Sequence, residues 1–315
     1  MTFRVLVSDK LDKKGCDALA AAAGIVVDVK PGLKPAEQEA IIGDYDGLIV
    51  RSATKVNDAL LARATKLKIV IRAGIGVDNI NIAACKAKDI VVENTPRGNV
   101  VSAAEHAISL MMSLARQVPL ASVTTKSGVW EKSKFMGTEI TGKTLGIIGT
   151  GNIGAIVIDR ALGLRMKVVA FDPLLTADKA KAFGIEKLEH IDELWPRADV
   201  ISLHVPLLPG TRHLLNDAAF AKMKKGVLLI NAARGGLIDE DALLRAIESG
   251  TVRGAALDVF ETEPAQQNHP LFAREEIIAT PHLGASTFEA QVNVAIEAAE
   301  QMIAFATDGT RTNAF

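Results

Sequence analysis

Short apolar runs rich in valine and isoleucine recur along this chain, and segments with helical periodicity separate them. Continuous apolar runs are typical of strands buried on both faces, and strands that alternate with helices form parallel sheets covered on each side. The expected strands are residues 4–8, 25–29, 47–50, 69–71 and 90–92, and then residues 144–149, 167–171, 200–204, 227–231, 254–259 and 276–279. The sequence therefore predicts an α/β protein with two doubly wound, Rossmann-like parallel sheets.

Two long helices are expected to join the two sheets. Ser102, with Glu105 three residues later, has the pattern of a capping box and predicts the start of the first helix. Pro119 should end that helix, and the polar segment 120–142 that follows shows no regular pattern. The second long helix is expected over residues 287–305.

The composition narrows the classes of function. The 36 basic and 37 acidic residues nearly cancel, which argues against a general binder of nucleic acid or of membrane surfaces. No apolar run is long enough to span a membrane, and two cysteines, Cys16 and Cys85, cannot build a disulfide framework. Because no cluster has metal-ligand spacing, no metal is expected. The two cysteines fit a reducing compartment, so the protein is expected to be cytoplasmic.

A glycine-rich turn marks a dinucleotide site. Gly149, Gly151 and Gly154 form G-x-G-x-x-G between an expected strand and an expected helix, where backbone amides can approach a pyrophosphate. Asp172 follows the next strand, 18 residues after Gly154, where a carboxylate would bind ribose hydroxyls and repel a 2′-phosphate. The pattern favours NAD over NADP. The alternative is a tight turn without a ligand, in which Asp172 caps the turn that follows it.

The position of this motif assigns the two domains. We predict an NAD-binding Rossmann domain over residues 99–286. The last long helix should return to the first sheet, which gives a discontinuous, flavodoxin-like, substrate-binding domain of residues 1–98 plus 287–315. The two long helices are expected to cross between the domains.

Polar segments follow three strands of the second domain, at residues 231–236, 258–264 and 280–286. Ligands of doubly wound sheets bind at the carboxyl ends of the strands, so these segments should converge on one crevice. Their residue types suit oxidation of an alcohol beside a carboxylate. Histidine can accept the hydroxyl proton, a carboxylate can orient the histidine, and arginine can bind the substrate carboxylate with two hydrogen bonds.

Each of the three candidate residues also has a structural interpretation. His282 could be a satisfied histidine after a strand, and Arg234 could be a surface residue beside two glycines. Glu263 could be an acid that starts a helix before proline. Their joint spacing behind strands favours the catalytic interpretation.

Two arginines of the first domain indicate the substrate class. Arg51 and Arg72 directly follow expected strands and should reach one cleft, where Ser52, Gly74 and Asn99 can add neutral donors. One carboxylate needs one arginine, whereas a phosphate adds about two negative charges and suits two more. Surface salt bridges are the alternative for both arginines.

Several segments together resemble the D-2-hydroxyacid dehydrogenases. They are VLVSDKLD, DYDGLIVRSATKV, AGIGVDNI, NTPRGNVVSAAEH, WEKSKFMG, GAALDVFETEP and PHLGAST, and they extend over nearly the whole chain. The resemblance implies that His282 is the acid–base residue, Glu263 its carboxylate partner and Arg234 the substrate anchor. It also places Arg51, Ser52, Arg72, Gly74 and Asn99 around the substrate.

The same resemblance implies the cofactor contacts. Asn152 and Ile153 match phosphate-loop positions, and Asp258 matches the acid that holds the nicotinamide amide. The other implied contacts are Asp172, Val205, Ala232, Gly284, Ala285 and, from the first domain, Ile75, and His204 is expected at the adenine pocket. Two residues depart from the family pattern: Ala232 stands where relatives often carry cysteine, and Arg97 stands where a smaller or neutral residue is expected.

The function implied is NAD-dependent oxidation of D-3-phosphoglycerate to 3-phosphohydroxypyruvate, the first step of serine biosynthesis. The alternatives are a glyoxylate or hydroxypyruvate reductase on the same scaffold, and a non-catalytic NADH-sensing, corepressor-like protein. Longer relatives carry a C-terminal regulatory domain, so we expect either a short form or a truncated chain, without feedback by serine. A homodimer through the 120–142 region is expected, with a tetramer as the alternative, and Lys132 or Lys134 could reach a neighbouring subunit's site.

Overall fold

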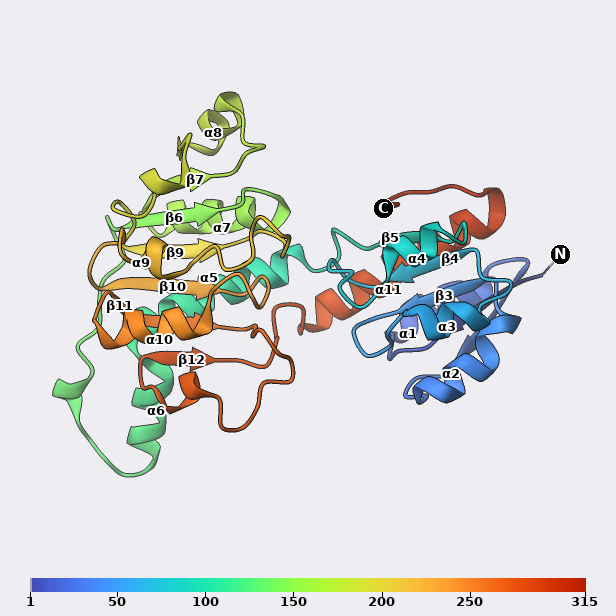
Figure 1. Cartoon of the computed structure of the whole chain (residues 1–315), viewed down its shortest axis with the longest axis horizontal. Coiled ribbons are helices and arrows are strands. Elements are labelled where there is room, and N and C mark those ends of the chain that lie inside the picture. The colour runs from blue at the N-terminus through green and yellow to red at the C-terminus, as the bar shows by residue number, and fades with distance from the viewer. Residues whose placement is uncertain (1) are drawn as a thin grey trace. The chain divides into compact units, whose positions relative to one another are not determined.

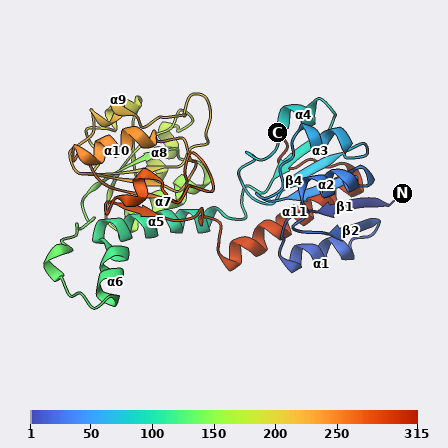
Figure 2. The same cartoon turned by 60° about the horizontal axis from the view of Figure 1, so that its bottom comes forward.

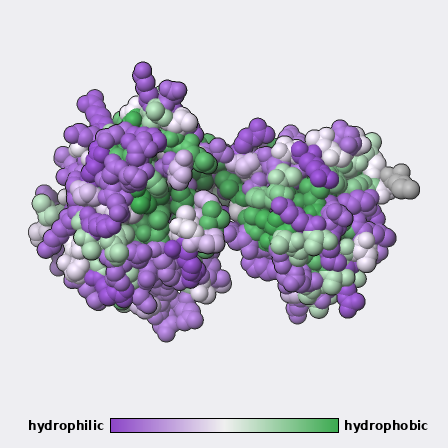
Figure 3. Space-filling model, turned by 45° about the horizontal axis from the view of Figure 1, so that its top comes forward, coloured by the Kyte–Doolittle hydropathy of each residue, from purple (hydrophilic) through white to green (hydrophobic). Residues whose placement is uncertain are grey.

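The structure, a computed structural model, describes residues 2–315 and divides the chain into two α/β units. The first unit comprises the residues up to Val100 together with Ala285–Phe315, and the second comprises Val101–Gly284. Hydrophilic residues cover most of the face of each unit drawn in Figure 3, and hydrophobic residues gather in smaller patches. Among the described residues, no helix combines the length and the apolar character needed to cross a membrane.

The first unit is a five-stranded parallel sheet with the order β2-β1-β3-β4-β5, which is the flavodoxin-like order (Figure 1). Its strands are β1 (Phe3–Val7), β2 (Ile25–Val29), β3 (Gly47–Val50), β4 (Ile69–Arg72) and β5 (Val91–Asn94). Its helices are α1 (Lys13–Ala21), α2 (Pro35–Ile41), α3 (Asp58–Arg63), α4 (Ile82–Lys86) and α11 (Phe288–Asp308). The predicted doubly wound parallel sheet is confirmed.

Helices cover both faces of this sheet. Leu19 of α1 and Met302 of α11 pack in one core with Ile49 and Ile71. Leu61 of α3 and Cys85 of α4 lie in the core on the other face. The strands are therefore buried on both sides, which is why they read as continuous apolar runs in the sequence.

The second unit is a seven-stranded parallel sheet with the order β12-β11-β10-β9-β6-β7-β8. Counted along this unit, the order is 3-2-1-4-5-6 with one added strand, so the predicted Rossmann sheet is confirmed. Its strands are β6 (Thr144–Ile148), β7 (Lys167–Phe171), β8 (Glu186–Lys187), β9 (Val200–Leu203), β10 (Val227–Asn231), β11 (Val252–Leu257) and β12 (Ile277–Ala279). Its helices are α5 (Val100–Arg116), α6 (Val118–Lys126), α7 (Asn152–Gly163), α8 (Ala177–Phe183), α9 (Asp217–Phe220) and α10 (Glu240–Glu248).

Two separate cores lie on the two faces of this sheet. Met111 of α5 and Ile158 of α7 belong to one core, and Phe220 of α9 and Leu243 of α10 belong to the other. The strand order reverses between β6 and β9, because β7 lies beyond β6 and β10 beyond β9. The carboxyl ends of β6 and β9 therefore flank the crevice in which doubly wound sheets bind ligands.

Short polar side chains set the starts of several helices. Asn57 accepts a hydrogen bond from the Leu60 amide at 3.1 Å at the start of α3. Thr287 accepts one from the Ala290 amide at 3.1 Å at the start of α11. Each side chain satisfies one of the amides that a helix leaves without an internal partner at its first turn.

The structure corrects two predictions around α5. The helix begins at Val100, so Ser102 lies within it and is not its N-cap. Pro119 does not precede an irregular segment but lies in the first turn of α6, where a missing amide hydrogen costs nothing. Gln117, whose φ of 53° is left-handed, separates the two helices. No residue of α6 is buried, and α6 with the segment after it projects from the rest of its unit (Figures 1 and 2).

Three further elements differ from the predictions. α2 is mostly polar, so apolar periodicity did not reveal it, and it is set by Pro35 and by Glu37, which accepts from the Lys34 amide at 2.7 Å. β8 has two residues at the sheet edge, too few for a pattern. The sequence also predicts a helix over residues 191–196, but the structure has a single 3₁₀ turn there, Ile191–Glu193.

Candidate functional site

The glycine loop follows β6 at the switch point of the seven-stranded sheet. A Cβ at Gly149, whose φ is 93°, would lie 2.5 Å from the His204 carbonyl oxygen, and one at Gly154 would lie 2.1 Å from the Gly149 carbonyl oxygen. At Gly151, the N-cap of α7, a Cβ would meet nothing within 4 Å. Two glycines are therefore required by close backbone approach, and the third faces open space beside the first amides of a helix. This cradle fits a dinucleotide pyrophosphate.

Asp172 lies directly after β7 and is tied to the glycine loop. Its carboxylate accepts hydrogen bonds from the Thr150 amide at 2.7 Å, the Thr150 hydroxyl at 2.9 Å and the Leu174 amide at 2.8 Å. Burial raises its pKa, but these hydrogen bonds outweigh burial and hold the pKa below its usual value. Asp172 thus caps the local turn and also keeps a charged carboxylate beside the loop, where a ribose diol fits.

The end of β9 forms the other side of the switch point. His204 accepts or donates a hydrogen bond with the Ser202 hydroxyl at 2.8 Å, and burial lowers its pKa to about 4. The neighbouring Val205 side chain lies 2.7 Å from the position of a Cβ on Gly149. A neutral imidazole and an apolar side chain therefore border the loop.

The loop after β10 is shaped by two residues. Asn231 is buried, accepts from the Ala233 amide at 3.1 Å and donates to the Arg234 carbonyl at 2.9 Å. A Cβ on Gly235 would lie 1.8 Å from the Phe260 carbonyl oxygen, so only glycine allows this loop to approach the loop after β11. Arg234 is therefore placed next to the segment that carries Glu263. The sequence indicates no role for Asn231 beyond its place in the polar segment 231–236, because an ordinary apolar strand precedes it.

His282 and Glu263 form a hydrogen-bonded pair. His282 Nδ1 lies 2.7 Å from Glu263 Oε2, and Glu263 Oε1 accepts from the Phe260 amide at 3.1 Å. The carboxylate orients the imidazole through Nδ1, so Glu263 does not occupy the other ring nitrogen, Nε2. The structure thus brings together Glu263 and His282, from the loops after β11 and β12, on the same edge as Arg234.

Asp258 holds the segment that carries His282. Only 1% of it is exposed, and its carboxylate accepts from the Thr280 hydroxyl at 2.6 Å, the Leu283 amide at 2.7 Å and the Gly284 amide at 2.9 Å. His106 Nε2 of α5 lies 3.1 Å from the same carboxylate. Burial raises the pKa of Asp258, but His106, Thr280 and Leu283 lower it below its usual value, so the buried carboxylate is charged.

Arg51 of the first unit lies directly after β3, beside the switch point between β1 and β3. Its amide donates to Asp9 at 2.6 Å, and its guanidinium donates to Gln291 Oε1 of α11. Gln291 Nε2 also donates to the Ala285 carbonyl at 2.7 Å. Burial lowers the pKa of Arg51, partly offset by Asp9, and its Nε is buried without a hydrogen-bond partner among residues 2–315.

Gln291 is a functional candidate that sequence reasoning missed. Its signal is weak, since it is one of several polar residues on a helix whose apolar pattern dominates. Only the tertiary structure brings it to Arg51, 240 residues earlier in the chain.

The other candidates of the first unit lie along the same carboxyl edge. Arg72 ends β4, and a Cβ on Gly74, whose φ is 149°, would lie 1.7 Å from the Arg72 guanidinium. A larger residue at this position would be strained by the positive φ and would displace the Arg72 guanidinium from the loop. Asn99 is buried, and within the described residues its Oδ1 has no hydrogen-bond partner.

The remaining predicted residues lie in their expected units. Ser52 is exposed, Ile75 is half-buried with its carbonyl accepting from Asn94 at 2.6 Å, and Ala232 is half-buried in the loop after β10. Arg97 is exposed and lies 3.7 Å from Glu297 of α11, which gives this unexpected arginine an ion-pair partner within its own unit. In residues 2–315, no three or more His, Cys, Asp or Glu side chains could together hold a metal ion.

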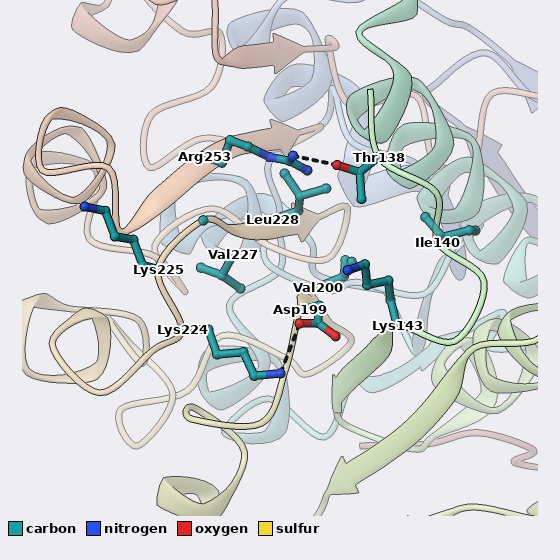
Figure 4. Close-up of a pocket in the computed structure, with 11 residues that line it drawn as sticks. Thr138, Ile140, Lys143, Asp199, Val200, Lys224, Lys225, Val227, Leu228 and Arg253 are labelled. Atoms are coloured by element: carbon teal, nitrogen blue, oxygen red, sulfur yellow. Dashed lines mark hydrogen bonds and ion pairs between the residues drawn. The ribbon is translucent and has the colours of Figure 1, made fainter. Parts of the chain in front are cut away.

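A cavity of about 180 Å³ lies at the opposite edge of the seven-stranded sheet (Figure 4). Lys143 and Asp199 line it just before β6 and β9, so it opens at the amino ends of the strands. Lys224 pairs with Asp199 at 3.0 Å, and the Lys225 side chain points away from the other side chains drawn. The cavity therefore lies at the opposite ends of the strands from the glycine loop.

Comparison with known proteins agrees with this arrangement. Residues 108–284 match the family described as "D-isomer specific 2-hydroxyacid dehydrogenase, NAD binding domain". The D-3-phosphoglycerate dehydrogenase of Rattus norvegicus is 48% identical over 300 residues, which are 95% of this chain and 56% of that protein. That of Bacillus subtilis is 48% identical over 308 residues, which are 96% of this chain and 57% of that protein. The chain thus spans little more than half the length of these curated relatives.

Comparison with a solved structure agrees with the family assignment. The D-lactate dehydrogenase of Aquifex aeolicus, complexed with NAD and lactic acid, has a TM-score of 0.86 and 29% identity, over 97% of this chain and 96% of that one. The resemblance that the motifs indicated is confirmed.

Proposed function

Because the chain belongs to the D-isomer-specific 2-hydroxyacid dehydrogenases and contains their NAD-binding domain, we propose that it oxidises D-3-phosphoglycerate to 3-phosphohydroxypyruvate with NAD. The observation that carries the proposal is the His282–Glu263 pair, because it leaves one imidazole nitrogen to receive the proton of a substrate hydroxyl. The likeness to D-3-phosphoglycerate dehydrogenases supports the choice of substrate. The reaction produces a precursor of serine.

His282 and Glu263 act together as the acid–base pair. Glu263 fixes the tautomer by accepting a hydrogen bond from the protonated Nδ1. Nε2 is then unprotonated and can accept the proton of the C2 hydroxyl. As the imidazole becomes positively charged, the neighbouring carboxylate stabilises that charge. In the reverse direction the imidazolium returns the proton to the carbonyl oxygen.

Arg234 binds the carboxylate of the substrate. A guanidinium presents two parallel N–H donors to a carboxylate, and its charge polarises the carbonyl that develops at the adjacent carbon. Asn231 and Gly235 position the arginine by holding its loop against the loop of Glu263.

NAD, when bound, supplies the hydride acceptor. The Gly149–Gly154 loop, with the amides of Asn152 and Ile153, would hold the pyrophosphate, and Asp172 would hold the adenosine ribose. Further contacts come from His204, Val205, Ala232, Asp258, Gly284, Ala285 and Ile75.

The arginines of the first unit recognise the phosphate. Arg51 offers a charged fork with a buried, unsatisfied Nε, and Arg72 adds a second charge at the same sheet edge. Ser52, Gly74 and Asn99 supply neutral groups beside them. An unphosphorylated acid would leave the buried Arg51 Nε unsatisfied, which costs binding free energy and gives specificity.

The test is NADH formation with D-3-phosphoglycerate and with D-glycerate in parallel, with the product withdrawn, for the wild type and for His282→Gln. We expect strong preference for the phosphorylated acid, and loss of turnover by about 10²-fold or more in the variant. Turnover of glycerate or hydroxypyruvate alone would retain the family and overturn the substrate. NADH binding without turnover of any hydroxyacid would favour a sensing protein.

We also propose that a second copy of the chain covers α6. No residue of this helix is buried in one copy, and Trp130, which follows it, is 84% exposed. Lys132, beside it, is then available to the neighbouring copy, whereas Lys134 lies 3.4 Å from Glu275 of its own chain. Light scattering of the wild type and of Trp130→Asp tests this, and a wild-type monomer would contradict it.

A further inference from the structure

One face of α5 contacts the segment that carries His282 at two points. Ser102 and His106 are four residues apart and therefore lie on the same helix face. The Ser102 hydroxyl donates to the Gly284 carbonyl at 2.8 Å, and His106 Nε2 lies 3.3 Å from the Thr280 hydroxyl. The two contacts hold the two ends of the segment Thr280–Gly284, with His282 at its centre.

Asp258 links the helix to the same segment. His106 lies 3.1 Å from its carboxylate, which also accepts from Thr280, Leu283 and Gly284. Because Asp258 is 1% exposed, its charge must be balanced by these donors. His106 is the one basic side chain that the structure places against it within the described residues.

His282 needs this support, because its backbone is in an unfavourable conformation. Its φ of 56° lies in the left-handed region, which costs free energy for any residue with a Cβ. Its amide donates to the Asp258 carbonyl at 2.9 Å and to the Thr280 carbonyl at 3.0 Å, so the main chain of Asp258 also holds it. The conformation persists because the surrounding hydrogen bonds over-determine it.

We propose that Ser102 and His106 are positioning residues for the acid–base reaction, acting through Asp258 and the Thr280–Gly284 segment. Their hydrogen bonds go to Gly284 and Thr280 and not to the His282 imidazole, so they hold the backbone of the segment on which His282 meets Glu263. The inference rests on the proposed function for its kinetic consequences, but not for its structural ones. A displacement of about 1 Å at a reacting group costs as much as 10²-fold in rate.

Four single variants test the proposal. His106→Leu removes the donor to Asp258, and His106→Gln restores a side-chain N–H. Ser102→Ala removes the second contact with little change of volume. Glu105→Gln, on the exposed side of the same helix, is the matched control. For each we measure kcat and KM with D-3-phosphoglycerate, and hydrogen–deuterium exchange of the peptide covering residues 280–284 in the protein without cofactor.

We expect His106→Leu to lower kcat by about ten- to a hundredfold with KM changed less than about threefold. The 280–284 peptide should exchange faster, while peptides of β11 should not change. His106→Gln should recover most of kcat and of the protection, Ser102→Ala should show smaller changes in the same direction, and Glu105→Gln should match the wild type.

Two results would overturn the inference. One is unchanged exchange of the 280–284 peptide in both His106→Leu and Ser102→Ala. The other is equal behaviour of His106→Leu and His106→Gln, which would show that the donor is irrelevant. If His106→Leu does not fold, Ser102→Ala and His106→Gln decide the matter. A wild type inactive on D-3-phosphoglycerate would refute the proposed function, whereas the exchange measurement would still decide the positioning role.

Discussion

His282 Nδ1 and Glu263 Oε2 lie 2.7 Å apart, which is within the range of a charge-assisted hydrogen bond. Burial raises the pKa of Glu263, but the hydrogen bond and charge of His282, with the Phe260 amide, outweigh burial and lower the pKa below its usual value. Glu263 is therefore ionised at neutral pH and is able to stabilise a positively charged imidazole. The pair is therefore suited to the acid–base role that we propose for His282.

Glu263→Gln should lower kcat by about 10²-fold, because the amide keeps the shape of the side chain but not the charge that stabilises the imidazolium. The affinity for NADH should change little. Steady-state kinetics and a fluorescence titration with NADH measure the two quantities. Glu261→Gln, two residues earlier, is the control, and equal losses in both variants would contradict the role of Glu263.

Arg51→Gln should reduce kcat/KM for D-3-phosphoglycerate by about 10²-fold and alter the rate with D-glycerate by less than about threefold. The guanidinium is expected to meet the phosphate, which glycerate lacks. Arg51→Lys keeps the charge without the two-pronged geometry and should fall between wild type and Arg51→Gln. Parallel losses with both substrates would instead indicate a structural role for Arg51.

Asp172→Asn should tighten binding of NADP by about tenfold, because it removes the negative charge that opposes a 2′-phosphate. Binding of NAD should weaken, since a carboxylate accepts ribose hydroxyls better than an amide does. Fluorescence titrations with NADH and NADPH give both constants. Asp178→Asn on α8 is exposed and serves as the control. An unaltered ratio of the two constants would exclude Asp172 as the discriminating residue.

Gly154→Ala should destabilise the second unit by about 1–3 kcal/mol and abolish tight NADH binding, because the new methyl group would lie 2.1 Å from the Gly149 carbonyl oxygen. Gly163→Ala is the matched control on the same helix, since a Cβ there meets nothing within 4 Å. It should be neutral or stabilising by as much as about 1 kcal/mol. Urea unfolding of both variants tests the contrast, which fails if the two behave alike.

His204 should make the second unit less stable in mild acid. Burial lowers its pKa from 6.5 to about 4, so between these values the unfolded chain binds a proton that the folded chain does not. His204 therefore does not reduce the free energy of unfolding above about pH 6.5. Below that pH the free energy of unfolding decreases by as much as about 1.4 kcal/mol per pH unit. The loss should be smaller in His204→Gln, whose amide can still meet the Ser202 hydroxyl.

Tryptophan fluorescence measures this transition, because both tryptophans, Trp130 and Trp195, belong to the second unit. Urea unfolding curves of the wild type and His204→Gln are compared at neutral pH and at about pH 5. If the two proteins lose equal stability on acidification, other groups are responsible.

The sequence by itself determined the fold class, the two sheets, the dinucleotide loop and the family. Each follows from information that is local in the chain. Strands buried on both faces must be apolar throughout. Gly149, Gly151 and Gly154 lie within six residues of one another because one tight turn needs all three. The His282, Glu263 and Arg234 motifs are local too, since each follows the end of its own strand.

Only the tertiary structure decided which residues support that site. Ser102 has the local pattern of an N-cap, yet it lies inside α5 and bonds to Gly284, 182 residues away. His106 meets Asp258, and Gln291 meets Arg51, which also lie far apart in the sequence. These contacts leave no periodicity or spacing in the sequence, because they depend on which elements the folded chain brings side by side. Local patterns specify strands, helices and turns, whereas buried polar pairs are specified by packing between elements distant in sequence.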